Sequence, residues 1–236
     1  MPAYKPCVVL VPVASAIEPE TLECLTRLMD RGYRVETLRG CSQVDLARAI
    51  LATDAVRAGY SETMWIDSDV VFQVEDVERL RMHERPIACG LYPKKGKPEF
   101  AAKFLSGTEQ AKVGTIGGLM EIEYAGFGFM HVRIDVFKRM ESQLKLPRCV
   151  GAGDPTKEIV PYFLPLVAEK FGKWQYMSED ASFCERARKC GFPTFADTTI
   201  KVRHIGRYAY SWDDLTQRPS YDGLELTFTD SGKGAR

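Results

Sequence analysis

The sequence predicts an α/β protein in which helices flank a mostly parallel central sheet. Short apolar runs alternate with amphipathic segments through roughly the first 96 of its 236 residues. The order strand, helix, strand, helix, strand is typical of parallel strands joined by covering helices. One apolar run also contains two aspartates near its end, where open α/β sheets hold their ligands. We therefore expect a Rossmann-like N-terminal half.

The first three elements follow one another at short intervals. Residues 7–13, CVVLVPV, are nearly all apolar, as in a strand covered on both faces. Pro19 is placed to open a helix, and Gly32 is placed to end it. Residues 33–39, YRVETLR, alternate in polarity and predict a second strand.

The next elements complete the N-terminal half. Ser42 and Asp45 have the spacing of a capping box at the start of a second helix. Residues 63–72, TMWIDSDVVF, predict a third strand that contains both aspartates. A helix over 74–83 and a strand over 86–92 follow.

The second half of the chain is less regular. Residues 118–133 give strand-like runs interrupted by Gly126 and Gly128, and IDVFKRMESQL over 134–144 predicts a helix. Residues 147–173 are rich in Pro and Gly, so we expect a long loop with one short helix.

The last predicted elements begin with a helix over 178–191. Ser178 is placed to cap this helix, and Gly191 is placed to stop it. Residues 198–206, TTIKVRHIG, predict a final strand, and an aromatic segment, RYAYSWDDL, follows it.

Composition and charge give no indication of a nucleic-acid-binding or membrane protein, although a local basic site stays open. Lys plus Arg and Asp plus Glu both number 32, so no global charge indicates a nucleic acid or an anionic membrane. The seven cysteines form no C-x-x-C pair, which is typical of reduced thiols and predicts a cytoplasmic protein. No apolar run has the length of a membrane span, and the N-terminal run does not resemble a signal peptide.

Asp67 and Asp69 are the first candidates for chemistry. On an ideal strand their side chains would face the same side, toward the ligand edge of the sheet. Two carboxylates there suit Mg²⁺ or Mn²⁺ bound together with substrate phosphates. The alternative is that D-x-D occurs by chance and one carboxylate caps a turn.

Six segments in a fixed order strengthen the metal-site interpretation. They are VVLVPV, QVDLARA, MWIDSDVVF, YAGFGFMHVR, MSEDASFCERARKCG and IKVRHIG. Together they span about residues 7–206 and resemble the metal-dependent nucleotide-sugar glycosyltransferases of the GT-A fold. The resemblance implies one GT-A-like domain over 1–230, with a nucleotide-sugar-binding half over about 1–96, an acceptor-binding half over about 97–230, and a tail at 231–236.

The resemblance also implies the reaction and its metal. A nucleoside-diphosphate sugar would give its hexosyl or pentosyl group to an acceptor hydroxyl, with Mn²⁺ or Mg²⁺ stabilising the leaving diphosphate. Asp69 would be the principal metal ligand, and Asp67 would contact the ribose or the metal through water. His204 would complete the metal site, and imidazole beside carboxylates favours Mn²⁺ over Ca²⁺. The alternative for His204 is a strand-end histidine bonded to the backbone.

Glu179 and Asp180 match the acidic pair that begins a helix under the acceptor in the family. In inverting relatives the second carboxylate removes the proton of the acceptor hydroxyl, whereas retaining relatives need no such base. Acidic residues in the first turn of a helix are also favoured by the helix dipole alone. The stereochemical outcome therefore stays open.

Other residues are assigned to the donor by the same resemblance. Arg48 would help to hold the nucleotide, the loop after the first strand would cradle base and ribose, and two glycines would let the chain approach the sugar. The donor-binding set is Pro12, Val13, Ala14, Arg48, Asp67, Ser68, Gly126 and Gly128. Solvation of Arg48 and a strand bulge at the glycines are the alternatives.

Basic and aromatic side chains give weaker indications. Candidates for binding the diphosphate or an anionic acceptor are Lys94, Lys95, Lys201 and Arg203, and candidates for stacking are Tyr208, Tyr210 and Trp212. Charges of this kind are more often solvated. His83 is interpreted as a surface residue, and His131 as an ordinary strand residue.

Two further functional classes remain open. A nucleotidyltransferase normally has a Gly-rich phosphate loop after the first strand, but the sequence there is PVASAIEPE. A non-catalytic sugar- or nucleotide-binding protein is the other class. The acceptor and the oligomeric state stay open as well: a small molecule, a glycan, a lipid-linked glycan, a protein or a modified nucleic-acid base would each be possible.

Overall fold

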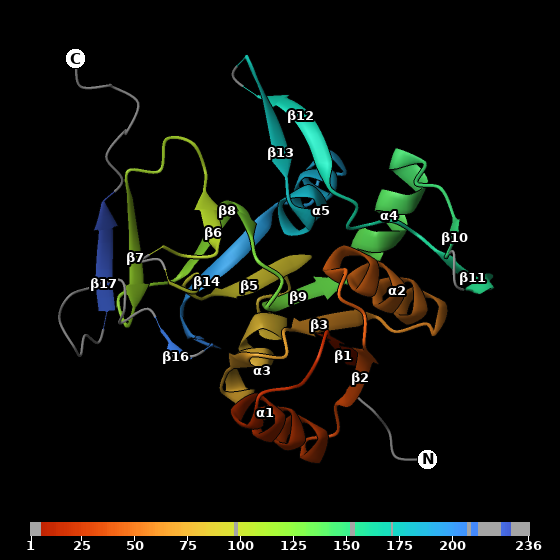
Figure 1. Ribbon diagram of the computed structural model, residues 1–236. Coiled ribbons are helices and arrows are strands. Elements are labelled where there is room, and N and C mark those ends of the chain that lie inside the picture. Colours follow the sequence, from red (N-terminus) through yellow and green to blue (C-terminus); the bar gives the residue numbers. More distant parts are fainter. Residues whose placement is uncertain are drawn as a thin grey trace.

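The computed structural model describes residues 6–96, 99–151, 154–170, 172–206, 209–211 and 223–227. Its centre is an eight-stranded sheet with the strand order β2-β1-β3-β9-β5-β14-β8-β6 (Figure 1). These strands are β1 (Cys7–Val13), β2 (Arg34–Arg39), β3 (Glu62–Ile66), β5 (Ile87–Leu91), β6 (Ala102–Phe104), β8 (Leu119–Ala125), β9 (Phe129–Arg133) and β14 (Thr194–Lys201).

The directions of the strands confirm the predicted mostly parallel sheet, although neighbouring strands pair in both parallel and antiparallel fashion. The pairs β1–β2, β1–β3 and β5–β14 are parallel, and the other four pairs are antiparallel. Consequently only β9 and β8 run against the other six strands of this sheet. The protein is therefore an α/β protein whose mixed central sheet is compatible with a GT-A-like single domain.

In the described residues, five helices cover the two faces of the sheet. They are α1 (Pro19–Asp30), α2 (Val44–Arg57), α3 (Val74–Met82), α4 (Ile134–Leu144) and α5 (Glu179–Lys189). Buried residues of α1 and α3 belong to one hydrophobic cluster, and buried residues of α2, α4 and α5 belong to a second cluster. Every residue of β1 is buried, and its alternate side chains enter the two clusters, as expected for a strand covered on both faces.

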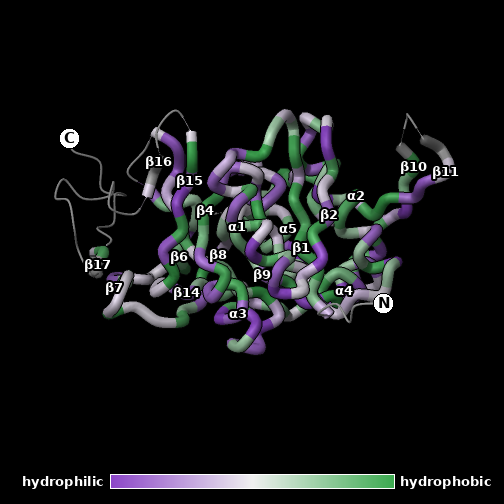
Figure 2. Tube along the Cα trace, turned by 90° about the horizontal axis from the view of Figure 1, so that it is seen from below, coloured by the Kyte–Doolittle hydropathy of each residue, from purple (hydrophilic) through white to green (hydrophobic). Residues whose placement is uncertain are grey.

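Smaller sheets surround the central one. Their strands are β4 (Val70–Val71), β7 (Gln110–Gly114), β10 (Cys149–Gly151), β11 (Asp154–Ile159), β12 (Leu166–Lys170), β13 (Lys173–Met177), β15 (Arg203–Ile205), β16 (Ala209–Tyr210) and β17 (Gly223–Thr227). Figure 2 shows β10 and β11 at one end of the molecule and β7 and β17 at the other. In the part of the chain that the structure describes, no helix is both long and apolar enough to cross a membrane.

The predicted third strand is wrong in its second half. The strand β3 ends at Ile66, and a turn follows in which the Val70 N–H donates to the Asp67 carbonyl (3.2 Å). After the turn, β4 pairs with β15 in a separate sheet. Because Asp67 and Asp69 occupy the turn, the alternation of a strand does not apply to them, and their carboxylates contact different side chains.

The prediction for residues 147–173 is also wrong. The described part of this segment contains no helix; it contributes β10 and β11, which form one hairpin, and β12, which pairs with β13. The Pro and Gly content misled the prediction because local composition does not report pairing partners. Similarly, the predicted final strand over 198–206 is divided between β14 and β15, and two more strands follow it.

Two local predictions need correction and one is confirmed. The N-cap of α2 is Gln43 instead of Ser42, and its side chain makes no capping bond. Ser178 is the N-cap of α5 as predicted, although its side chain also makes no capping bond. His83 is only 25% exposed and its Nε2 lies 2.8 Å from Asp197 Oδ2, so it is not simply a surface residue.

Candidate active site

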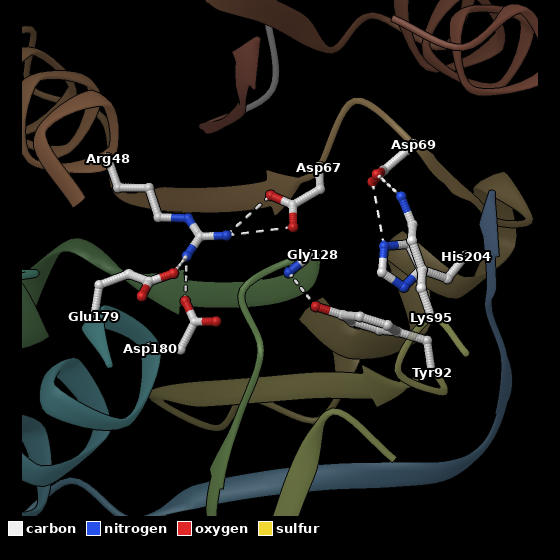
Figure 3. A network of polar contacts seen from close by, with 9 residues as sticks. All are labelled: Arg48, Asp67, Asp69, Tyr92, Lys95, Gly128, Glu179, Asp180 and His204. Atoms are coloured by element: carbon white, nitrogen blue, oxygen red, sulfur yellow. Dashed lines mark hydrogen bonds and ion pairs between the residues drawn. The ribbon is translucent and has the colours of Figure 1, made fainter. Parts of the chain in front are cut away.

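The predicted site residues converge at the carboxyl ends of β1, β3 and β5. The turn after β3 carries the D-x-D motif, and the exposed loop after β1 lies beside it, because the Glu18 N–H donates to the Ser68 carbonyl (2.8 Å). Figure 3 shows two polar groups here: one around Arg48, and one formed by Asp69, Lys95 and His204. This is the edge at which α/β sheets of this kind hold ligands.

Arg48 is the centre of the first group. Its guanidinium donates to Asp67 Oδ1 (3.0 Å), to Glu179 Oε1 (3.1 Å) and to Asp180 Oδ1. The Arg48 side chain is 3% exposed and lies over the Phe127 ring, 5.4 Å from its centroid. Arg48 therefore connects α2 to both the D-x-D turn and the first turn of α5, and it is not a solvated helical arginine.

The charges of this group perturb one another. Burial alone would lower the pKa of Arg48, but Asp180, Asp67 and Glu179 outweigh burial and hold it well above its usual range. Burial raises the pKa of the Asp180 carboxyl to about 7; Arg48 opposes this shift, and the charges of Glu179 and Asp67 add to it. Three carboxylates share one cation, so the group carries excess negative charge, and a proton on one carboxylate reduces this excess.

Asp69 and His204 form the second group. His204 Nε2 lies 3.5 Å from Asp69 Oδ1, and Lys95 Nζ lies 2.5 Å from Asp69 Oδ2. Burial alone would raise the pKa of Asp69, but His204 and Lys95 outweigh burial and hold it below its usual value. The strand β15 brings His204 here, because its residues 203 and 204 pair with β4 directly after the turn.

The ligand atoms of this second group, one carboxylate and one imidazole, suit a divalent cation. His204 Nδ1 lies 3.1 Å from the Pro93 carbonyl oxygen, which only accepts, so Nδ1 carries the hydrogen of that bond. This arrangement orients the imidazole and directs Nε2 toward Asp69, as is usual for metal-binding histidines. One carboxylate and one imidazole leave most of a coordination sphere for phosphate oxygens and water. The Asp69 carboxylate already binds one cationic group, the ammonium of Lys95.

Tyr92 lies between the two groups and was not predicted from the sequence. The buried Gly128 N–H donates to Tyr92 Oη (2.9 Å), and the Tyr92 ring packs edge-on against His204 with centroids 5.2 Å apart. A Cβ at Gly126 would lie 2.4 Å from Tyr92 Oη, and one at Gly128 would lie 2.5 Å from it. Close packing against Tyr92 thus explains both glycines. The signal available in the sequence was a tyrosine at the end of an apolar run.

We expect Gly126→Ala and Gly128→Ala each to lower the unfolding free energy, and Tyr92→Phe to rescue only the first. Without the hydroxyl, the nearest Tyr92 atom to the new Cβ is Cζ, at 3.2 Å for Gly126 but 2.8 Å for Gly128. Overpacking of this kind costs about 1–3 kcal/mol. Urea unfolding of the single and double variants measures the rescue. Equal rescue at both positions would contradict this account of the glycines.

The remaining predicted residues contribute less to the two groups. Pro12 and Val13 are buried in β1, and the Val13 carbonyl accepts from the Gly40 N–H (2.9 Å), whereas Ala14 is exposed at the site. Lys94 pairs with Glu99. Lys201 and Arg203 are exposed on β14 and β15. Of the predicted stacking residues, Tyr208 and Trp212 lie outside the described residues, and for Tyr210 only the backbone strand is described.

A separate group of possible metal ligands lies at the opposite ends of β1 and β3. Ligand atoms of Cys7, Glu62 and His131 lie within 4.8 Å of one another. However, Arg81 Nε is 2.6 Å from Glu62 Oε2, so this carboxylate already has a cationic partner. The contact with His131 lowers the pKa of Glu62, burial opposes this shift, and Arg81 adds to it. The two contacts outweigh burial, and the pKa of Glu62 is about 2.

Comparison with known proteins supports the fold. No family model and no curated protein matches the chain. Among solved structures, the crystal structure of A197 from STIV matches over 98% of this chain and 97% of that chain, with 15% identity and a TM-score of 0.55. At this identity the likeness shows the fold alone. A glycosyltransferase involved in the glycosylation of the major capsid of PBCV-1 matches 58% of this chain and 65% of that chain, with 11% identity and a TM-score of 0.32, too low to carry an argument.

Proposed function

We propose that the protein is a metal-dependent glycosyltransferase that moves a sugar from a nucleoside diphosphate to an acceptor hydroxyl. The observation that carries this proposal is the approach of His204 Nε2 to Asp69 Oδ1 (3.5 Å), beside the carboxylates that Arg48 gathers. These residues come from distant parts of the sequence, and the fold brings them together at one edge of the sheet. A Mn²⁺ or Mg²⁺ ion would be held by Asp69 and His204, and when bound it would supply positive charge to the leaving diphosphate.

The other residues have distinct roles in this proposal. Asp67 and Ser68 belong to the turn that would contact the ribose, together with the exposed Ala14 of the loop after β1. Arg48 positions Asp67, Glu179 and Asp180 relative to one another. Lys95 leaves Asp69 and binds the diphosphate when donor enters, because its ammonium group is exposed enough to move.

Asp180 is proposed as the general base. As the acceptor oxygen bonds to the anomeric carbon, the bond from that carbon to the diphosphate oxygen breaks, and the diphosphate leaves with the electron pair. The acceptor proton passes to the Asp180 carboxylate. Burial and its acidic neighbours raise the pKa of Asp180 to about 7, which suits a base that works near neutral pH. This role predicts an inverted anomeric configuration in the product, to be read by NMR.

The experiment that tests the function is hydrolysis of nucleotide sugars in the absence of an acceptor. We expect one donor of a panel of UDP-, GDP-, ADP- and dTDP-sugars to release its nucleotide slowly with Mn²⁺, and EDTA to stop this release. Cleavage of a nucleoside triphosphate to pyrophosphate instead would indicate a nucleotidyltransferase. Absence of turnover and binding for every donor would refute the proposal.

Asp180→Asn is expected to change how stability depends on pH. A carboxyl whose pKa is raised in the folded state stabilises the protein below the pKa of the unfolded chain, and this stabilisation disappears as the pH rises through the folded value near 7. Between pH 5 and pH 8 the wild type should therefore lose about 2 kcal/mol more unfolding free energy than Asp180→Asn. Urea unfolding at both pH values measures the difference.

Asp54→Asn is the matched control for that measurement. Asp54 is 54% exposed on α2 and pairs only weakly with Arg57 (3.3 Å), so this variant should follow the wild type at both pH values. If Asp180→Asn also follows the wild type, the carboxyl does not have a raised pKa in the folded protein.

A further inference from the structure

We propose that the hairpin of β12 and β13 is a carbohydrate-binding platform, and hence that the acceptor is a neutral glycan. The role of the glycan as an acceptor rests on the proposed function, but glycan binding itself can be measured without a nucleotide-sugar donor.

One face of the hairpin exposes a large apolar and aromatic surface. Trp174 and Tyr176 are each 75% exposed, and Val167 is 62% exposed. Val167 pairs with Tyr176, and Glu169 pairs with Trp174, so these four side chains share one face of the two strands. No described residue covers this face, although a tryptophan and a tyrosine side by side are costly to leave in water. Exposed aromatic patches of this kind mark binding sites.

The opposite face attaches the hairpin to α5. Ser182 Oγ accepts from the Leu166 N–H (2.9 Å) and donates to the Met177 carbonyl (3.0 Å), so a single side chain of α5 holds the base of both strands. Met177 is 7% exposed against the core. The hairpin is therefore held to the helix that carries Glu179 and Asp180.

The platform lies close to the proposed base. The strand β13 continues through Ser178 directly into α5, and Figure 1 shows the hairpin projecting from that end of the helix. Asp180 is four positions after Tyr176, which limits their Cα atoms to about 14 Å apart. A chain of a few sugar units stacked on Tyr176 and Trp174 would thus place a terminal hydroxyl within reach of Asp180.

Charge favours a neutral sugar over a polyanion. Among the described hairpin residues on this face, Glu169 carries the only charge, and it is negative. A nucleic acid or a sulfated glycan would need cations here to offset its own charge. Sugar rings instead place their C–H face on an aromatic ring and their hydroxyls in water, and Tyr176 and Glu169 add groups that bond hydroxyls.

The test is direct binding of soluble neutral oligosaccharides of glucose, mannose, galactose and N-acetylglucosamine, without donor or metal. We expect at least one series to bind, and Trp174→Ala to weaken its binding about tenfold. Trp174→Phe keeps a stacking ring and should recover most of the affinity. Met82→Ala removes a residue that is also 75% exposed, at the end of α3, and should bind like the wild type. Heparin and a single-stranded DNA oligonucleotide are the anionic probes.

Three results would overturn the inference: no binding of any neutral oligosaccharide, equal binding by Trp174→Ala, or preferential binding of heparin or DNA. A dimer in sedimentation that Trp174→Ala dissociates would also overturn it, because the face would then be an interface between copies of the chain. Donor hydrolysis is measured separately on the wild type. Hydrolysis without glycan binding refutes only the platform, and glycan binding without any donor binding or hydrolysis refutes only the proposed function.

Discussion

Arg48→Met is expected to lower the unfolding free energy by about 3–5 kcal/mol, the largest effect on stability that we predict for a single substitution. Arg48 is 3% exposed, while its partners Asp67, Glu179 and Asp180 are 20–26% exposed. Without the guanidinium, three partly buried carboxylates would face one another with no cation between them. Urea unfolding monitored by circular dichroism measures the loss.

Two variants give this prediction its controls. Arg57→Met changes an arginine of the same helix that is 54% exposed, and should cost less than about 0.5 kcal/mol. Arg48→Met combined with Asp180→Asn should be more stable than Arg48→Met alone, because one of the opposed charges is gone. A cost below about 1 kcal/mol for Arg48→Met would show that the guanidinium does not hold the three carboxylates in solution.

Asp69→Asn is expected to have the largest effect on activity. The amide keeps the size of the side chain but removes the charge that would hold the cation together with His204. A metal ion is worth several kcal/mol at a departing phosphate, so donor hydrolysis should fall about a hundredfold or more. The rate of nucleotide release at saturating Mn²⁺ measures this effect.

The matched control again separates a local effect from a general one. Asp54→Asn should hydrolyse the donor like the wild type, because Asp54 lies on the exposed side of α2. The fold of Asp69→Asn should persist, since the Asp69 carboxylate pairs among the described residues with the partly exposed Lys95 and His204. Undiminished hydrolysis by Asp69→Asn would show that the D-x-D motif does not take part in the reaction.

Local sequence patterns predicted much of the fold. The runs that form β1, α1, β2 and α4 carry their own signals in apolar periodicity and in Pro and Gly at the ends, and the structure places them within one or two residues of the prediction. The hairpins between Cys149 and Met177 were missed because their strands are short and partly exposed, so pairing rather than periodicity defines them.

The candidate site was predictable in its residues but not in its connections. The motif order selected Arg48, Asp67, Asp69, Asp180 and His204, and the fold places all of them at one edge of the sheet. The division into two groups depends on the turn after Ile66. The prediction of one strand over TMWIDSDVVF did not include this turn. Tyr92 was missed because its role comes from two glycines far along the chain.

The most direct test of the central claim is a thermal-shift measurement with a panel of nucleotide sugars, with and without Mn²⁺. A ligand at about one hundred times its Kd adds about 2.7 kcal/mol to the stability of a folded protein, which is an easily measured rise in Tm. We predict that one donor raises Tm only when Mn²⁺ is present, and that Asp69→Asn loses this rise. No rise with any donor, or an equal rise in EDTA or in Asp69→Asn, would contradict a site in which Asp69 and His204 hold the donor through a cation.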